Sequence, residues 1–280
     1  MIRKGYVDVS LEDRVSQTHL RRAGSGVPIV MLHPSPMSSA FLQPVIECAG
    51  RHLEVFAPDN PGYGRSDPLP DPPDSLAGYT AWLAALLDAL GLGQAAVYGS
   101  ATGAQIAIEF SKAYPERVSA MVLENVAHFE ADEVERIMED YFPDISPRAD
   151  GAHLATVWSM AAAVFRGFPW YEHLGREAGD SPPLDLVHAT AMAYLDAGPD
   201  YARAYRAAFL NERADRLAAV PVPVKVVRWS GGLLNEFSKR LDEHPMPAHI
   251  EMLHCGPAVD ARFAALDSAF AALASGAQRA

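Results

Sequence analysis

Residues 97–104 read VYGSATGA, and this stretch decides the fold. A short apolar strand runs into a turn that two glycines frame, Gly99 and Gly103. Ala101 occupies the centre of the turn, a position that such a frame exposes at the end of a strand. Residues elsewhere in the chain determine whether this turn belongs to a catalytic site or has only a structural role.

Apolar runs like this one recur along the chain and alternate with helical patterns. The runs are VPIVMLH (27–33), LEVFAPD (53–59), AAVYG (95–99), VSAMVLE (118–124), VKVVRWS (224–230) and HIEMLH (249–254). Continuous apolar runs are typical of strands buried on both faces, and helices between them indicate βαβ units. Residues 6–22 resemble a hairpin. We therefore predict the α/β class, with a mostly parallel twisted sheet and an antiparallel hairpin at one edge.

Composition excludes several classes of partner and compartment. The chain has 280 residues, a net charge of −12 and no Lys/Arg cluster, so we expect neither a nucleic acid nor a membrane as partner. Cys48 and Cys255 are too few for a disulfide framework, and no apolar leader or membrane span is present. We expect a cytoplasmic protein with a small-molecule substrate. A homodimer stays open as its assembly.

Residues 127–206 interrupt the alternation, because they are helical, aromatic and punctuated by proline. An insertion directly after a strand lies where open α/β sheets bind ligands, which favours a lid over the site; a purely structural bundle is the alternative. We predict a core domain over 1–126 and 207–280, with a helical cap over 127–206.

Several separated motifs, taken together, resemble the α/β-hydrolase fold superfamily. DNPGYGRSD (59–67) matches the family's D-x-P-G-x-G-x-S-D loop nearly residue for residue, and IVMLHPSPMSS (29–39) resembles its strand and oxyanion loop. The stretch around Ala101 then has the frame of the family's nucleophile elbow, G-x-S-x-G. The resemblance implies an α/β-hydrolase fold in which helices flank the sheet and the insertion is the cap.

The residues that the family uses for serine hydrolysis are missing from their expected places. Ala101 stands where the nucleophilic serine would be. After VKVVRW the sequence continues SGGLLN, with no carboxylate before Glu236, and after HIEMLH it reads Gly256-Pro257 where the family has Gly-His. A laboratory serine-to-alanine change would explain Ala101 alone. The strings SATGA and DGAHL also look similar to relatives whose elbow reads G-x-H-T-G-A.

Backbone N–H groups can still donate hydrogen bonds where the catalytic side chains are missing. The resemblance implies an oxyanion hole built from two amides, those of Thr102 and of a residue in the loop after 29–33. Ser35 is the candidate in that loop, because Pro34 and Pro36 have no N–H group. Alanine at position 101 would leave room for a ligand carbonyl, which suits binding without covalent attack.

Candidates for acid–base catalysis are the polar residues at strand ends. Glu124 ends a buried strand beneath the cap and could act as a base; His33 and His254 are further candidates, each with a structural role as its alternative. Ser100 is a minor candidate for a replacement nucleophile. The cap contains four candidates for substrate contacts, each with ordinary packing as its alternative role: Trp158, Arg166, Trp170 and Tyr171.

Two classes of function follow. The first is an enzyme of non-serine mechanism that acts on a small, mostly apolar carbonyl compound: a lyase, an isomerase or cyclase, a C–C cleaving enzyme or an oxygenase, without cofactor. The second is a pseudoenzyme that binds a hydrophobic ligand or a partner. An atypical hydrolase, or a serine-to-alanine variant of an esterase, is the third. The ten histidines lack H-x-x-x-H and H-E-x-x-H spacing, so no metal site is expected.

Overall fold

One sheet organises the protein, as seen in a computed structural model that describes residues 1–69, 75–175 and 183–276. Its eight strands follow the order β1-β2-β4-β3-β5-β6-β7-β8. Strand β2 is antiparallel to both of its neighbours, and every other pair is parallel. The predicted α/β class, with a mostly parallel sheet and a hairpin at one edge, is confirmed.

The strands coincide with the apolar runs of the sequence. Their bounds are β1 Arg3–Leu11, β2 Arg14–Ala23, β3 Pro28–Leu32, β4 Glu54–Pro58, β5 Ala95–Ser100, β6 Val118–Glu124, β7 Val224–Trp229 and β8 Ile250–Cys255. Strand β5 is buried along its whole length, as a strand with helices on both faces must be.

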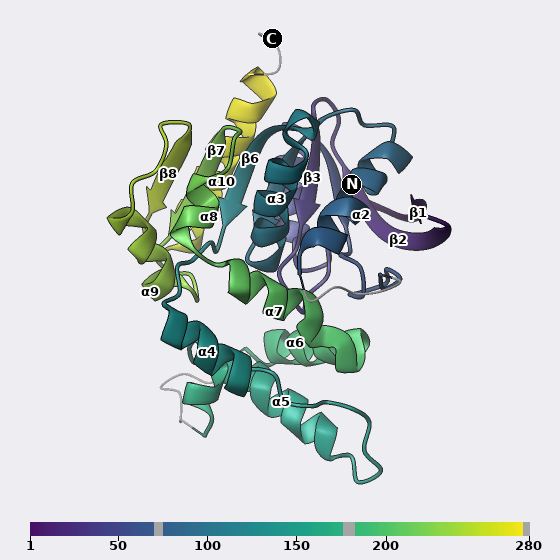
Figure 1. Ribbon diagram of the computed structural model, residues 1–280, viewed down its shortest axis with the longest axis vertical. Coiled ribbons are helices and arrows are strands. Elements are labelled where there is room, and N and C mark those ends of the chain that lie inside the picture. The colour runs from purple at the N-terminus through teal and green to yellow at the C-terminus, as the bar shows by residue number, and fades with distance from the viewer. Residues whose placement is uncertain (70–74, 176–182, 277–280) are drawn as a thin grey trace.

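Helices cover both faces of the sheet (Figure 1). One face packs against α1 (Gln43–Ala49) and α10 (Val259–Gly276) through a core that includes Tyr98 and Phe270. The other packs against α2 (Ala77–Ala89) and α3 (Thr102–Ala113) through a core that includes Trp82. Shorter helices near β7 are α8 (Ala214–Ala218) and α9 (Asn235–Ser238).

The insertion between β6 and β7 is helical, and Figure 1 shows its helices together beyond one end of the sheet. They are α4 (Ala131–Asp140), α5 (Ala152–Val164), α6 (Leu184–Ala197) and α7 (Ala202–Asn211). Helix α7 continues across residue 206, the position at which the sequence suggested a return to the core. These helices share a separate aromatic core around Phe129 and Tyr141.

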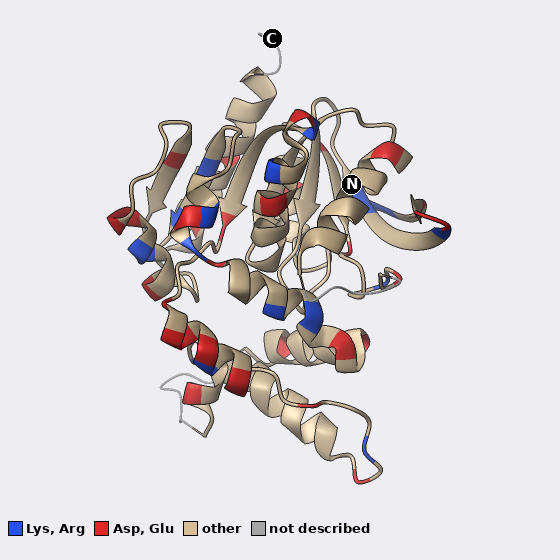
Figure 2. Ribbon diagram, in the orientation of Figure 1, with Lys and Arg blue, Asp and Glu red and all other residues tan. Residues whose placement is uncertain are grey.

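Acidic side chains gather along α4 and appear on many other elements, in line with the net charge of −12 (Figure 2). Within the described part of the chain, none of the helices has both the length and the apolar character needed to cross a bilayer.

Candidate active site

The turn at Ala101 joins β5 to α3 at the carboxyl edge of the sheet. Ala101 has φ 47° and ψ −115°, a conformation that L-residues other than glycine rarely adopt. Its amide donates to the Glu124 carbonyl over 3.1 Å, and its carbonyl accepts the first hydrogen bond of α3, from Gln105 N over 3.0 Å. The chain therefore keeps the strained elbow that exposes residue 101, although the side chain there is a methyl group.

The framing glycines are required by close packing. A Cβ on Gly103 would lie 2.2 Å from the Leu32 carbonyl oxygen, and one on Gly99 would lie 2.5 Å from the Gly103 carbonyl oxygen. Neither position has space for a side chain, so the elbow frame depends on both glycines.

Hydrogen-bond donors surround Ala101. Because α3 makes its first hydrogen bond at Gln105, the amides of its first turn, Thr102 included, precede the helical ladder and carry the positive end of the helix dipole. Leu32 of β3 pairs with Gly99 of β5. Ser35 and Thr102 each come three residues after this pair, one on each strand's continuation.

The side chains of Ser35 and Thr102 are buried without partners. Ser35 is 5% exposed and Thr102 is 1% exposed. Neither hydroxyl has a partner with hydrogen-bond geometry within the described chain, although the Tyr63 side chain lies beside that of Ser35. Buried hydroxyls are normally paired, because an unpaired one costs about 1–3 kcal/mol. Both residues lie just beyond the ends of the paired strands β3 and β5, where the elbow begins.

His33 is fully buried with both ring nitrogens engaged. Its Nε2 accepts from the Asn60 amide over 2.7 Å, so Nδ1 carries the proton and donates to the Pro34 carbonyl over 3.0 Å. Burial lowers the pKa of His33, which keeps the ring neutral. In this arrangement His33 links two loops and has no free nitrogen for proton transfer.

Glu124 is buried and paired on the α10 side of the sheet. Arg262 binds the carboxylate with both Nε and Nη2 at 2.8 Å, and the Tyr98 hydroxyl donates to Oε2 over 2.7 Å. The side chain thus connects β6 to α10 and holds three hydrogen bonds that a base at the elbow would have to break.

The other candidates from the sequence lie in different surroundings. Ser100 is buried and its Oγ accepts from Asn125 Nδ2 over 2.9 Å. His254 on β8 has a side chain that is 61% exposed, with Nε2 3.7 Å from an Asp242 oxygen. The register thus places Ser35 and Thr102 at corresponding positions beyond β3 and β5, while His33 and Glu124 have buried partners of their own and His254 is largely exposed.

The cap candidates divide between core and surface. Trp170 is buried and donates from Nε1 to the Tyr141 carbonyl over 3.1 Å, and Tyr171 packs beside both rings. Trp158 is 44% exposed. Arg166 is half-buried, and its Nε is buried without a hydrogen-bond partner in the described chain.

A buried carboxyl that the sequence analysis missed lies where the chain returns from the cap. Glu212 is 3% exposed, and no cation pairs with it among the described residues. Its Oε2 accepts from the Ala127 amide over 2.8 Å, and burial raises its pKa well above the ordinary value. The signal that could have found it is the polar pair Asn211-Glu212 directly after the apolar run AAFL at 207–210.

Glu212 lies beside the first turns of α3. Gln105, one turn beyond Ala101, neighbours Glu212 and accepts from Asn211 Nδ2 over 2.9 Å. The Gln105 Nε2 is buried and has no partner with hydrogen-bond geometry in the described chain, but it lies near the Glu212 carboxyl. Thr102 and Gln105 are three residues apart and so share one face of α3. Within ranges 1–69, 75–175 and 183–276, no three His, Cys, Asp or Glu side chains gather as a metal site would require.

A family model decides the evolutionary relationship. The model for the alpha/beta hydrolase fold matches residues 27–220. This chain belongs to the alpha/beta hydrolase fold family. The segment matched includes β3 to β6, the elbow and all four cap helices of this α/β-hydrolase-fold protein.

Curated relatives with detectable sequence similarity are hydrolases. The chain is 31% identical over 110 residues to a 2-hydroxy-6-oxo-2,4-heptadienoate hydrolase of Pseudomonas putida, covering 38% of this chain and 40% of that protein. It is 29% identical over 133 residues to a proline iminopeptidase of Neisseria gonorrhoeae, covering 44% of this chain and 39% of that one. The chain thus spans about two fifths of the length of these relatives.

Solved structures share the fold over nearly the whole chain. A haloalkane dehalogenase variant from Bradyrhizobium elkanii matches with a TM-score of 0.66 and 19% identity, covering 100% of both chains. A meta-cleavage product hydrolase from Pseudomonas fluorescens, in a serine-to-alanine variant, matches with a TM-score of 0.65 and 17% identity over 94% of this chain and 95% of that one. At this level of identity the likeness concerns the fold alone.

Proposed function

We propose that this α/β-hydrolase-fold protein is a cofactor-free enzyme that acts on a small, mostly apolar carbonyl compound without a covalent enzyme intermediate. The carbonyl oxygen binds at the amino end of α3, and the reaction belongs to the lyase, isomerase or cyclase, C–C cleavage or oxygenation classes.

The observation that carries this proposal is the pair of buried, unpartnered hydroxyls of Ser35 and Thr102 on either side of Ala101. Together with the Thr102 amide they supply donors where negative charge on an oxygen would develop. The methyl group of Ala101 leaves that position open to the ligand.

The absence of covalent chemistry rests on the same geometry. Ala101 has no nucleophilic atom, and Ser100 is turned to Asn125. His33 has both nitrogens engaged, so it cannot activate a serine or a water at the elbow without losing a bond.

For proton transfer we propose Glu212 in place of Glu124. It is a buried carboxyl without a cation, and it neighbours Gln105, one turn along α3 from the elbow. A carboxyl whose pKa is raised by burial keeps its proton to higher pH than an exposed glutamate does, and it can exchange that proton with a ligand.

The substrate class is supported by the relatives. Those named 2-hydroxy-6-oxo-2,4-heptadienoate hydrolase and 2-hydroxymuconate semialdehyde hydrolase have names that specify unsaturated carbonyl acids. An unsaturated carbonyl compound of this kind is therefore the probe for the present chain.

A binding experiment with 2-hydroxy-6-oxo-2,4-heptadienoate tests the site. Thr102→Val keeps the shape of the side chain and removes the hydroxyl, so we expect about tenfold weaker binding of the probe, as for a lost hydrogen bond to an anionic oxygen. Without ligand the variant should be at least as stable as the wild type, because it removes an unpaired buried hydroxyl. Calorimetric titration and urea unfolding measure the two effects.

Ser38→Ala is the matched control, since Ser38 belongs to the same loop as Ser35 but is half-buried. It should bind the probe like the wild type. Equal affinities for wild type and Thr102→Val would contradict the proposed oxygen site. Burst turnover of an activated ester that disappears in Ser100→Ala would contradict the non-covalent mechanism.

A ligand-binding protein without turnover is the second candidate. It is favoured by one observation: His33 and Glu124 are both saturated by protein partners. Glu212→Gln distinguishes the two. Loss of turnover with retained probe binding supports the enzyme, whereas absence of turnover in the wild type, with tight binding in both proteins, supports the binding protein.

A further inference from the structure

A second polar site lies against the edge hairpin formed by β1 and β2. A groove of about 630 Å³ is lined by residues of β1, β2, the loop after β3 and the loop after β4. The side chains that matter are Lys4, Tyr6, His19, Arg21, Asp59 and Arg65. We call this the hairpin groove.

Like charges face each other across the hairpin. In the register of β1 and β2, Lys4 lies directly opposite Arg21, and Tyr6 lies opposite His19 with the two rings in edge contact at 5.4 Å. Residues two apart share a face of a strand, so both pairs face the groove. Directly opposed like charges destabilise an antiparallel pair. An anion between Lys4 and Arg21 would remove that repulsion.

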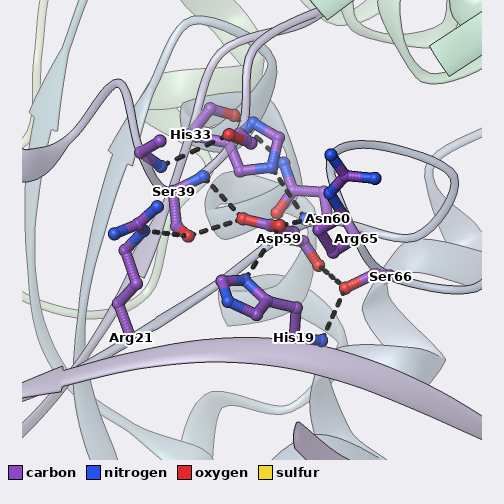
Figure 3. A network of polar contacts seen from close by, with 10 residues as sticks. His19, Arg21, His33, Ser39, Asp59, Asn60, Arg65 and Ser66 are labelled. Atoms are coloured by element: carbon purple, nitrogen blue, oxygen red, sulfur yellow. Dashed lines mark hydrogen bonds and ion pairs between the residues drawn. The ribbon is translucent and has the colours of Figure 1, made fainter. Parts of the chain in front are cut away.

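The buried carboxylate in the groove is already satisfied by other donors. Asp59 accepts from the Ser39 amide and hydroxyl at 2.7 and 2.5 Å, from the Arg65 amide at 3.0 Å and from His19 Nδ1 at 3.0 Å. Figure 3 shows this network, with Asp59 at its centre. The carboxylate keeps its charge, since hydrogen bonds from neutral amides and a hydroxyl do not cancel it, and it offsets one of the cationic groups around the groove.

Arg21 is held in place by the same network. Its Nε donates to Ser39 Oγ over 3.2 Å, and Ser39 is fixed by Asp59, as Figure 3 shows. None of Lys4, Arg21 and Arg65 has a carboxylate within 4 Å among the described residues. The terminal nitrogens of Arg21 are thus oriented without a counter-ion.

The acids that face the groove are few. Asp196 of α6 lines its rim, and Asp8, the next residue on the same face of β1, accepts from Gln17. Among the described residues, the groove is therefore lined by three permanent cations, Lys4, Arg21 and Arg65, and by two acids, Asp59 and Asp196, which leaves an excess of one positive charge in a protein whose net charge is −12.

We propose that the hairpin groove binds a dianionic phosphoryl group at Lys4 and Arg21, the opposed pair that has no carboxylate partner among the described residues. A guanidinium group matches the geometry of phosphate oxygens, and Arg21 with Lys4 supplies two positive charges, which suit a dianion better than a monovalent carboxylate. The site is separate from the elbow, because it lies on the hairpin side of the loop that contains Asp59.

Calorimetric titration with inorganic phosphate, phenyl phosphate and acetate at constant ionic strength tests the proposal. We expect phosphate to bind and acetate to bind at least about tenfold more weakly. Phenyl phosphate binding more tightly than inorganic phosphate identifies an ester as the ligand, and the reverse order identifies the free ion. Arg21→Gln and Lys4→Gln should each weaken phosphate binding by about tenfold or more.

The matched control is Arg22→Gln, because Arg22 is the next residue on β2 and its guanidinium lies on the other face, 5.0 Å from the Phe56 ring centre. It should retain phosphate binding. In phosphate-free buffer, Lys4→Gln should be as stable as the wild type or more stable, since it removes a like-charge pair. Equal phosphate affinities in wild type, Lys4→Gln and Arg21→Gln, or equal binding of acetate and phosphate, would overturn the proposal.

Discussion

At the scale of single residues, Ala101 keeps the backbone conformation of a nucleophile elbow but has no nucleophilic side chain. The residue adopts φ 47° and ψ −115°, and the first amides of α3, which follow it directly, have no partners within the helix. What is missing is an activating partner, since His33 Nε2 already accepts from Asn60.

Ala101→Ser therefore should not create an esterase. We expect no burst of product from an activated ester, because the new hydroxyl would have no free imidazole within reach to take its proton. Stopped-flow absorbance and intact-protein mass spectrometry measure the burst and any acyl adduct. A stoichiometric adduct formed at a catalytic rate would show that one of the histidines is available after all.

At the scale of elements, the Glu124–Arg262 pair ties the terminal helix α10 to the middle of the sheet. The partners are 138 positions apart in the sequence, and the carboxylate is 2% exposed. A buried ion pair whose second partner is removed leaves an uncompensated charge, which is far more destabilising than loss of a surface pair.

Arg262→Gln should lower the free energy of unfolding by about 3–5 kcal/mol, and the double variant Glu124→Gln/Arg262→Gln should recover part of that loss. Urea denaturation followed by tryptophan fluorescence gives both values. Arg148→Gln, which breaks an exposed pair with Asp150, is the control and should change stability by about 0–1 kcal/mol. A similar small effect for Arg262→Gln would mean that the pair is not what holds α10.

At the scale of the whole molecule, two chain segments connect the core to the cap, and they bind each other. The Phe129 amide donates to the Glu212 carbonyl over 3.1 Å, the Ala127 amide donates to the Glu212 carboxyl, and the Ala214 amide donates to His128 Nδ1 over 3.0 Å. The attachment of the cap therefore depends on a buried group whose pKa is raised.

This attachment makes stability depend on pH. Because the folded pKa of Glu212 lies above its unfolded value, the native state keeps a proton that the unfolded chain loses, so stability falls as pH rises through that window. The slope reaches about 1.4 kcal/mol per pH unit for one group. Glu212→Gln should flatten the decline measured by urea denaturation between about pH 5 and about pH 8. The control Glu135→Gln, on the exposed face of α4, should leave the slope unchanged.

The sequence predicted the fold well because its strands are buried on both faces and so read as continuous apolar runs, as in 118–124. It also placed Ser35, Ala101 and Thr102 directly after neighbouring strands, and β3 and β5 do pair in the sheet. It could not predict the partner of Glu124, since Arg262 arrives from a distant helix. The sequence analysis missed Glu212 for the same reason, because the burial of Glu212 arises from the packing of the cap against the core.

The two glycines that frame the elbow have a consequence for how the turn can change over time. Gly103 is fixed by the Leu32 carbonyl and Gly99 by the Gly103 carbonyl, so neither depends on the side chain at position 101. Residue 101 can therefore be replaced by cysteine, histidine or aspartate while the backbone around it stays the same. The protein is therefore a practical starting scaffold for directed evolution, in which a new head group is placed first and its partners are selected afterwards.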